Sequence, residues 1–339
     1  MSEHYKKNNE HQKAFKPNSP FSGLGSIVFM GTPEFAVASL DRLVRAGCNI
    51  VAVITAPDKP AGRGMQLQQS AVKKYALDKG LHILQPEKLK DPDFIERLRS
   101  LKADIQVVVA FRMLPEIVWN MPAMGTINVH GSLLPQYRGA APINWAIING
   151  EKYTGVTTFK LKHEIDTGDI LLTTKIAIGE NETAGELHDK MKETGADLLL
   201  KTIEGIANGS LTETPQHRTS NIEPAYRTGR HQILHNAPKL TTETCMINWN
   251  KKADEIYNLI RGLSPYPTAF TKLENKKLKI YGAEKMIETP TITAGNFETD
   301  GKTYLRFACS NGYINITALQ LEGKKIMPVK DFLRGYRFA

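Results

Sequence analysis

The sequence predicts an α/β fold with a mostly parallel sheet, followed by a small β-barrel domain. In the first half, short apolar strands alternate with amphipathic helices, an order that favours right-handed βαβ units and a parallel sheet. From about residue 240 onward, short strands recur between turn signals, which is typical of a small barrel. At 339 residues, the chain is long enough for two domains with separate cores.

The elements of the α/β part follow from apolar periodicity and turn residues. The first helix is expected from Glu34 to Arg45, ending before Gly47. A segment at 58–70 is rich in glycine and polar residues and is expected to be irregular. Asp91 is the predicted N-cap of a later helix. Strands are expected at 27–31, 49–57, 81–86, 103–110, 125–130, 153–161 and 169–178, and further helices at 71–80, 91–102, 142–150 and 183–209.

Changes in composition divide the chain into four segments. Residues 1–25 contain no apolar core of a secretory signal and are expected to be a disordered tail. Residues 26–206 form the α/β domain. A polar stretch at 207–238, interrupted by prolines and without periodicity, is the predicted linker. The barrel domain follows at 239–339, with one clear helix at 252–263.

The overall composition is that of a water-soluble protein. Hydrophobic residues make up 41% and charged residues 23%, and no apolar run approaches the roughly 20 residues that a membrane span needs. The three cysteines, Cys48, Cys245 and Cys309, are odd in number and far apart. This pattern indicates a reducing cytoplasm, with neither a disulfide framework nor a zinc site.

Positive charge is concentrated towards the C-terminal end. Residues 230–339 carry 17 Lys and Arg against 10 Asp and Glu, whereas residues 26–229 carry 23 of each. A local positive excess is the expected footprint of a polyanionic partner, but a solvated lysine-rich surface explains it equally well. Charge alone therefore leaves both interpretations open.

Polar side chains stand at the end of the strand expected at 125–130. Asn128 and His130 are two residues apart on it, so both point to one side, at the sheet edge where open α/β folds bind ligands. An amide can donate to a developing oxyanion, and an imidazole can move protons. Asp166 adds a carboxylate from a turn with Gly168. Without a serine or cysteine nucleophile, the set suits direct acyl transfer, although each residue could also be structural.

The stretch "NVHGSLLPQYRG" and its continuation to "EIDTGDIL" closely resemble the signature of the folate-dependent formyltransferases. That signature is Asn-x-His, then Ser-Leu-Leu-Pro, then an aspartate 36 residues after the histidine, which is the distance from His130 to Asp166. Other segments match in order, among them "VFMGTPEFAV", "TAPDKPAGRG", "GAAPINWA", "IRGLSPYPTAF" and "LQLEGKKIM". The likeness runs from about Ile27 to about Arg334. It implies a Rossmann-like catalytic domain and an OB-like barrel.

The resemblance also implies substrates and roles. The formyl donor would be 10-formyltetrahydrofolate, and the acceptor, in members that act on tRNA, the α-amine of methionyl-initiator tRNA. Asn128 and His130 would stabilise the oxyanion, while Asp166 would orient His130 and help to carry a proton through a water. No metal is implied, and we expect a monomer. Two loops would line the folate site: Ser132, Leu133, Leu134 and Pro135 in one, and Phe111, Arg112, Met113 and Leu114 in the other, which is one residue shorter than in many relatives.

Two regions are expected to hold the tRNA. The loop at 58–70 occupies the place of an insertion that simpler relatives lack, and its Lys59 and Arg63 could reach phosphates or a base of the acceptor stem. The barrel would hold the acceptor arm through its cations. These are Lys251, Lys252, Arg261, Lys276, Lys277, Lys324, Lys325 and Arg334.

Three other functions are compatible with parts of the sequence. A formyltransferase acting on a sugar amine or a glycinamide nucleotide would share the same polar residues, but it would need neither the basic loop nor the barrel. A non-catalytic RNA-binding protein would not need Asn128, His130 and Asp166. A nicotinamide-dependent oxidoreductase is disfavoured, because the turn "MGTPEF" at 30–35 is not a G-x-G-x-x-G fingerprint.

Overall fold

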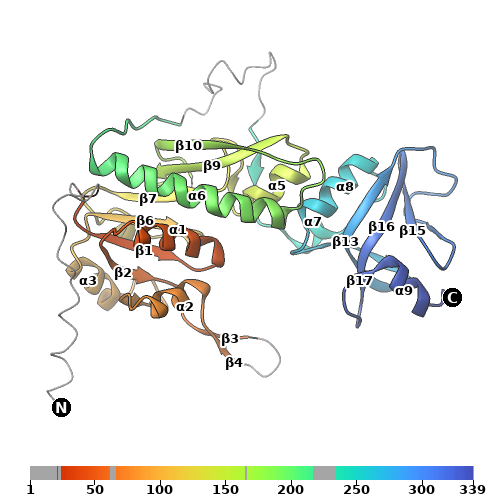
Figure 1. The fold of residues 1–339 in the computed structure, drawn as a ribbon, viewed down its shortest axis with the longest axis horizontal. Helices are drawn as coiled ribbons and strands as arrows, with labels where there is room; N and C mark the ends of the chain where they lie inside the picture. Colours follow the sequence, from red (N-terminus) through yellow and green to blue (C-terminus); the bar gives the residue numbers. More distant parts are fainter. Residues whose placement is uncertain (1–20, 22–23, 62–65, 165, 217–233, 339) are drawn as a thin grey trace. The chain divides into compact units, whose positions relative to one another are not determined.

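The described part of the chain folds into two compact units. The structure is a computed structural model that describes residues 21, 24–61, 66–164, 166–216 and 234–338 (Figure 1). Unit 1 comprises Met1–Asn128 and Leu199–Glu213, and unit 2 comprises Val129–Leu198 and Thr214–Ala339. Strand β7 (Thr126–His130) and helix α6 (Ala184–Ala207) contribute residues to both. The domain boundaries expected from the sequence lie elsewhere and stay a prediction.

Unit 1 is built on a parallel sheet (Figure 1). Its strands are ordered β6, β1, β2 and β5, and each neighbouring pair runs parallel. Strands β1 and β6 are buried at every residue, as continuous apolar strands covered on both faces should be. The bounds are β1 (Ile27–Gly31), β2 (Ile50–Ile54), β5 (Ile83–Leu84) and β6 (Ile105–Val109). The predicted mostly parallel α/β fold is confirmed.

Three helices connect these strands in unit 1, and a fourth follows β6. They are α1 (Glu34–Arg45), α2 (Ala71–Asp78), α3 (Pro92–Ser100) and α4 (Glu116–Trp119). Helix α1 has the predicted bounds, and the chain turns after it at Gly47, whose φ of 80° suits glycine. Asp91 caps α3 as predicted, because its carboxylate accepts the N–H groups of Asp93 (3.0 Å) and Phe94 (3.2 Å). The single turn α4 was not expected.

The segment at 58–70 is more regular than predicted. Strands β3 (Lys59–Ala61) and β4 (Gln66–Gln68) pair antiparallel over three residues each. The side chain of Leu67 is 69% exposed, and each strand is only three residues long, which is too short for the alternation by which strands are recognised. The prediction of an irregular loop was therefore wrong for these residues. Arg63 lies outside the described residues.

The first part of unit 2 continues from the end of β7. Strands β9 and β10 pair antiparallel and extend the sheet, in which the complete strand order is β10-β9-β7-β6-β1-β2-β5. The elements are β8 (Arg138–Gly139), α5 (Pro142–Ile148), β9 (Tyr153–Lys160) and β10 (Ile170–Ala177). The short β8 pairs in parallel with β11 (Asn236–Ala237), which lies in the predicted linker.

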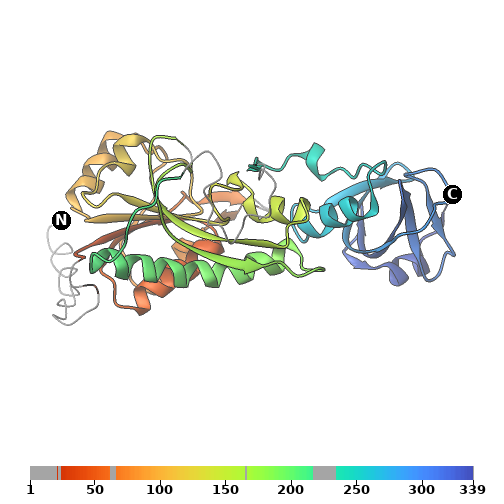
Figure 2. The ribbon, with the colours of Figure 1, turned by 90° about the horizontal axis from the view of Figure 1, so that it is seen from above.

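The C-terminal part of unit 2 is an antiparallel sheet, drawn in blue in Figure 2. Its strand order is β12-β13-β16-β15-β14, with β17 beside β16. Its apolar core includes Leu278, Ile280, Phe307 and Ile314. The expected small β-domain is confirmed as this barrel-like sheet. The strands are β12 (Ala269–Leu273), β13 (Lys276–Met286), β14 (Phe297–Thr299), β15 (Leu305–Cys309), β16 (Gly312–Leu321) and β17 (Met327–Pro328).

Three helices accompany this sheet. They are α7 (Thr242–Cys245), α8 (Ala253–Gly262) and α9 (Val329–Gly335). Only α8 was predicted. Helix α9 is two turns long and buries Val329, Phe332 and Leu333, which is too short a pattern to separate from a strand by periodicity.

Two residues of the predicted tail are part of the folded protein. Phe21 and Leu24 are 2% and 3% exposed, and the N–H of Leu24 donates to the carbonyl of Phe21 at 2.9 Å. Both side chains are therefore buried in the described structure, although the sequence prediction places them in the tail. Within the described ranges, no helix is both long and apolar enough to cross a membrane.

Candidate active site

Strand β7 carries the first two predicted catalytic residues. Ile127 and Val129 point to one face and are buried, so Asn128 and His130 share the other face. Asn128 is half-buried, and His130 is 7% exposed. The chain leaves the strand after His130, at the carboxyl end where open α/β sheets bind ligands.

The imidazole of His130 is held between two oxygen atoms. Its Nε2 lies 2.9 Å from the backbone carbonyl of Tyr137, and its Nδ1 lies 3.9 Å from Oδ2 of Asp166. Because a carbonyl oxygen only accepts hydrogen bonds, the contact with Tyr137 requires a proton on Nε2. In the neutral ring, the lone pair is then on Nδ1, the nitrogen that faces Asp166. The edge of Phe159 closes another side, with ring centroids 6.4 Å apart.

Asp166 is positioned by its backbone and by one neutral donor. Its φ of 54° lies in the left-handed region, which few residues other than glycine, asparagine and aspartate adopt. Its Oδ2 accepts the N–H of Gly139 at 3.0 Å, and the side chain is 12% exposed. The carboxyl group is thus fixed beside Nδ1 of His130 by a donor that carries no charge.

The turn that carries Asp166 depends on a glycine. A Cβ on Gly168 would lie 1.5 Å from the carbonyl oxygen of Lys160, so no other residue fits without moving the backbone. Gln216 donates to the carbonyl of Gly168 at 2.6 Å and accepts from Arg138 at 2.6 Å. Gln216 lies in the predicted linker, and no sequence signal pointed to it.

The loop after β7 uses some of its predicted folate-site residues to hold its own shape. Ser132 is fully buried and donates to the carbonyl of Gln136 at 2.6 Å. Thr157 donates to the carbonyl of Ser132 at 2.7 Å and accepts the N–H of Leu134 at 3.2 Å. Leu134 is 5% exposed, whereas Leu133 and Pro135 are half-buried. Of the four, Leu133 and Pro135 therefore offer side-chain surface to a ligand.

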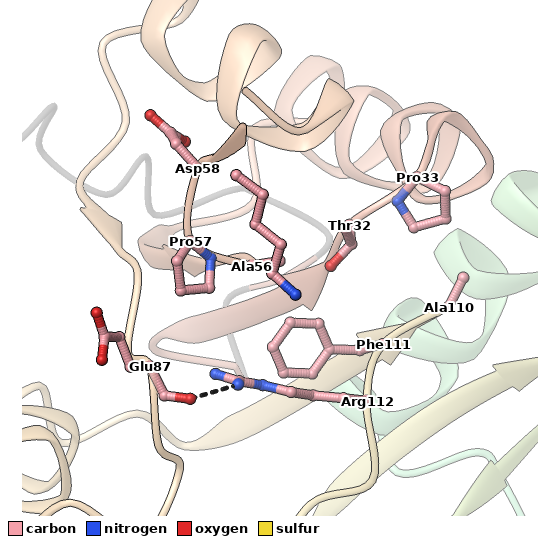
Figure 3. A pocket seen from close by; sticks show the side chains of 10 residues that line it. Thr32, Pro33, Ala56, Pro57, Asp58, Glu87, Ala110, Phe111 and Arg112 are labelled. Carbon is pink, nitrogen blue, oxygen red and sulfur yellow. Dashed lines mark hydrogen bonds between the residues drawn. The ribbon is translucent and has the colours of Figure 1, made fainter. Parts of the chain in front are cut away.

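In unit 1, a cavity of about 620 Å³ opens where parallel strands end (Figure 3). The residues that follow β1, β2 and β6 meet there, which is the expected place for a ligand in this architecture. Lys59, predicted to contact tRNA, is among its residues. The lining is Thr32, Pro33, Ala56, Pro57, Asp58, Lys59, Glu87, Ala110, Phe111 and Arg112.

Arg112 braces one wall of this cavity. Its guanidinium donates to the carbonyls of Pro86 and Glu87, the latter at 2.8 Å, and lies 5.6 Å from the ring centroid of Phe111 (Figure 3). Partial burial lowers the pKa of Arg112 from its ordinary value. The bonds tie the turn after β6 to the chain after β5, so Arg112 supports the turn as well as lining it.

A second cavity of about 600 Å³ lies on the other side of the same turn. Three of the predicted folate residues, Arg112, Met113 and Leu114, line it together with Leu89 and other residues of the turn and of α4. Met113 is 73% exposed and presents an apolar surface to a ligand. All four predicted residues of this turn thus face one cavity or the other.

Of the predicted C-terminal cations, one is buried and hydrogen-bonded within the protein, and the others are exposed to solvent. Arg261 is 7% exposed, and its guanidinium donates to the carbonyls of Gly179 (3.3 Å) and Glu182 (2.9 Å) and to Asn258 (2.9 Å). Its expected contact with tRNA is therefore wrong, because these three acceptors use it inside unit 2. The other seven predicted cations are exposed: Lys251, Lys252, Lys276, Lys277, Lys324, Lys325 and Arg334.

The structure brings His130 and Asp166 together within unit 2, beside the loop with Ser132–Pro135. Asn128 and the turn with Phe111–Leu114 belong to unit 1. In the described part of the chain, no group of three or more His, Cys, Asp or Glu is arranged to hold a metal ion.

Family patterns match both halves of the chain. The pattern described as "Formyl transferase" covers residues 25–203, and that described as "Formyl transferase, C-terminal domain" covers residues 239–337. The chain therefore belongs to the formyl transferase family. The catalytic pair His130 and Asp166 predicted from the resemblance lies within the first pattern.

Its curated relatives define a narrower group. The chain is 56% identical over 317 residues to a protein of Phocaeicola vulgatus and 51% identical over 318 residues to one of Bacteroides fragilis, both named "Methionyl-tRNA formyltransferase". Each match covers 92% of this chain and 95% of the relative. The predicted family is thereby confirmed, and the relatives include the C-terminal domain.

Solved structures confirm the fold. The sugar 3N-formyl transferase WlaRD, crystallised with dTDP and 5-N-formyl-THF, has a TM-score of 0.61 at 23% identity over 89% of this chain and 99% of its own. HypX of Aquifex aeolicus, in complex with tetrahydrofolic acid, has a TM-score of 0.61 at 17% identity over 92% of this chain. The present chain spans 48% of the HypX chain.

Proposed function

We propose that this chain transfers the formyl group of 10-formyltetrahydrofolate to the α-amine of methionyl-initiator tRNA, without a covalent enzyme intermediate. One observation carries the choice of acceptor. Proteins about half identical to this chain, over 92% of its length, are named for that acceptor. The structural likeness to a sugar formyltransferase is far lower in sequence and supports only the shared fold.

In the proposed reaction, Asn128, His130 and Asp166 have different roles. The neutral amine attacks the formyl carbon, and the carbonyl oxygen gains negative charge, to which the amide of Asn128 donates. Nδ1 of His130 accepts the proton that the amine loses, because Nε2 is already protonated and bound to Tyr137. Asp166, 3.9 Å away, stabilises the imidazolium so formed.

The same proton completes the transfer. The protonated Nδ1 donates to the oxyanion and then gives its proton to the leaving folate nitrogen as the bond from that nitrogen to the formyl carbon breaks. One proton moves from the amine to the leaving nitrogen, and His130 ends in its original state. Removal of one oxyanion donor costs on the order of 10²–10³ in rate in other enzymes.

The cavities of unit 1 fit the folate and the acceptor in size and chemistry. The cavity lined by Leu89, Met113 and Leu114 has about 600 Å³, within the usual range for a small ligand. Its apolar side chains suit a planar ring system, and Lys90, Arg112 and Glu116 add charged groups to the same lining. In the other cavity, the cations Lys59 and Arg112 are balanced by the carboxylates Asp58 and Glu87, so we propose a single contact there, from Lys59 to a phosphate of the tRNA. We propose that the exposed cations of the C-terminal sheet hold the acceptor arm.

The test is a transfer assay with the full chain. Labelled 10-formyltetrahydrofolate and methionyl-initiator tRNA are incubated with the protein, and we expect label on the methionyl amine. Reactions without folate, with uncharged tRNA and with a dTDP-linked amino sugar serve as controls. Formylation of the amino sugar but not of the charged tRNA would assign the protein to the other branch of the family.

A further inference from the structure

The chain between the two predicted domains enters the candidate active site. Strand β11 (Asn236–Ala237) pairs in parallel with β8 (Arg138–Gly139), in the loop between β7 and α5 that follows His130. Ala237 is fully buried, and its carbonyl accepts the N–H of Ala140 at 2.7 Å. These residues therefore behave as a part of the loop, although the sequence marks them as a linker.

His235 is the residue of this segment that reaches Tyr137. The two rings stack, with centroids 5.7 Å apart and planes 19° from parallel. The N–H of Tyr137 donates to the carbonyl of His235 at 2.7 Å, and the N–H of His235 donates to the side chain of Gln136 at 2.9 Å. Ring and backbone of His235 thus hold the same neighbour.

Tyr137 needs such support. It is 4% exposed, and its φ of 57° places a bulky residue in the left-handed region, a conformation that persists only where the surroundings enforce it. Its hydroxyl donates to Glu151 at 2.7 Å and accepts from Asn149 at 3.2 Å. With the ring, the N–H and the hydroxyl fixed, the carbonyl of Tyr137 is aimed at Nε2 of His130, 2.9 Å away.

We infer that His235 is a positioning residue of the catalytic centre. It holds Tyr137 so that the Tyr137 carbonyl keeps the proton on Nε2 of His130 and leaves Nδ1 for the reacting amine. The step in which Nδ1 accepts a proton rests on the proposed function, but the position of the ring proton does not. The segment that leads into the C-terminal domain thereby completes the catalytic centre.

Three variants of the full chain separate this role from general stability. His235→Ala removes the stacked ring, and His235→Phe restores a flat ring without ring nitrogens. Trp145→Phe is the matched control, because it removes a hydrogen bond of 2.8 Å from the indole to the carbonyl of Pro238 in the same segment and leaves Tyr137 untouched. Formylation kinetics give kcat and both KM values, and ¹⁵N NMR of labelled histidines gives the protonated ring nitrogen. His130→Gln identifies the signals of His130.

We expect wild type to carry the proton of neutral His130 on Nε2. His235→Ala should mix the two tautomers and lower kcat about 10- to 100-fold with little change in KM, the size of effect that a small misplacement of a catalytic group produces. His235→Phe should restore both kcat and the tautomer, and Trp145→Phe should keep both. A wild-type proton on Nδ1 would overturn the inference even if His235→Ala fails to fold, and so would an unchanged tautomer and kcat in His235→Ala. If the wild type transfers no formyl group, the proposed function fails, while the ring-nitrogen measurement still decides the inference.

Discussion

Oδ2 of Asp166 lies 3.9 Å from Nδ1 of His130 and accepts the backbone N–H of Gly139 at 3.0 Å. Oδ2 of Asp166 thus interacts with both the backbone and the imidazole. The neutral Gly139 donor fixes its place without cancelling its charge, and the charge then acts on the imidazole, mainly once the ring is protonated. This arrangement suits a histidine that becomes positive during the reaction and neutral again at its end.

Asp166→Asn separates the charge of this residue from its shape. Asparagine can keep the hydrogen bond from Gly139 and tolerates the positive φ, so the fold should persist. We expect kcat to fall about 10²- to 10⁴-fold, because the imidazolium loses its counter-charge. Single-turnover formylation and a thermal melt check this. A near-wild-type rate in the folded variant would remove Asp166 from the proton transfer.

Asn128→Ala tests the oxyanion donor on the other predicted residue of β7. We expect kcat to fall about 10²- to 10³-fold with an unchanged melting temperature, because a half-buried amide is lost without opening the core. The KM for folate should change little if the amide acts on the transition state alone. A rise in KM with an unchanged kcat would instead make Asn128 a binding residue.

Gly168→Ala tests the turn that presents Asp166. The new methyl group would meet the carbonyl of Lys160 at 1.5 Å, so the turn must move. We expect a loss of about 1–3 kcal/mol of stability, as overpacking causes, together with a large loss of kcat. Gly335→Ala is the control, because its new Cβ would meet no atom within 4 Å. Equal melting temperatures and rates in the two variants would contradict the crowding argument.

Residues with local signals were predictable, and residues with distant partners were not. Helix α1 and the cap Asp91 follow from periodicity and capping chemistry within one helix. His130 and Asp166 follow from the likeness of their motif, which the structure places 3.9 Å apart. Gln216 and His235 carry no such signal, because their partners lie far away along the chain and are partly backbone carbonyls.

The burial of the charged side chain of Arg261 was likewise not predictable from the sequence. Arg261 was expected among the barrel-domain cations that hold the acceptor arm of the tRNA, yet it is buried against the carbonyls of Gly179 and Glu182. Burial lowers its pKa from the ordinary value, and the carbonyl acceptors compensate the lost water. Which face of α8 is covered depends on tertiary packing, which the helix's own sequence does not contain.

Salt dependence tests the role of the exposed cations. The KM for charged tRNA should rise at least about tenfold between 50 and 200 mM salt, because bound counterions compete with lysines for phosphates, while the KM for folate stays nearly constant. The double variant Lys324→Gln, Lys325→Gln should flatten this dependence. Arg99→Gln on α3 is its control, since that arginine pairs with Glu96 at 2.7 Å and is not among the predicted tRNA contacts. A tRNA KM that ignores salt would contradict binding through phosphates.

Tyr137→Phe separates the phenol of this residue from its backbone carbonyl. Loss of the hydroxyl leaves Glu151 and Asn149 without their partner, and we expect a loss of about 1–3 kcal/mol of stability. The variant should keep most of its kcat, because His235 still stacks on the ring and accepts the N–H of residue 137, which hold the carbonyl that binds Nε2 of His130. Tyr257→Phe, which removes a hydrogen bond of 2.8 Å to Asn181, is the control for loss of a buried phenol.

The pH dependence of the Tyr137→Phe effect gives a second readout. The pKa of Tyr137 is raised above its ordinary value, mainly by burial of the phenol and also by its hydrogen bond to Glu151. The phenol then stabilises the folded state below the unfolded-state pKa of about 10, and this contribution disappears as pH rises towards the folded-state pKa. Unfolding of wild type and variant at pH 7 and above pH 10 should therefore show a gap in stability that narrows with pH. A kcat that falls while stability is unchanged would mean that the hydroxyl is needed to aim the Tyr137 carbonyl at His130.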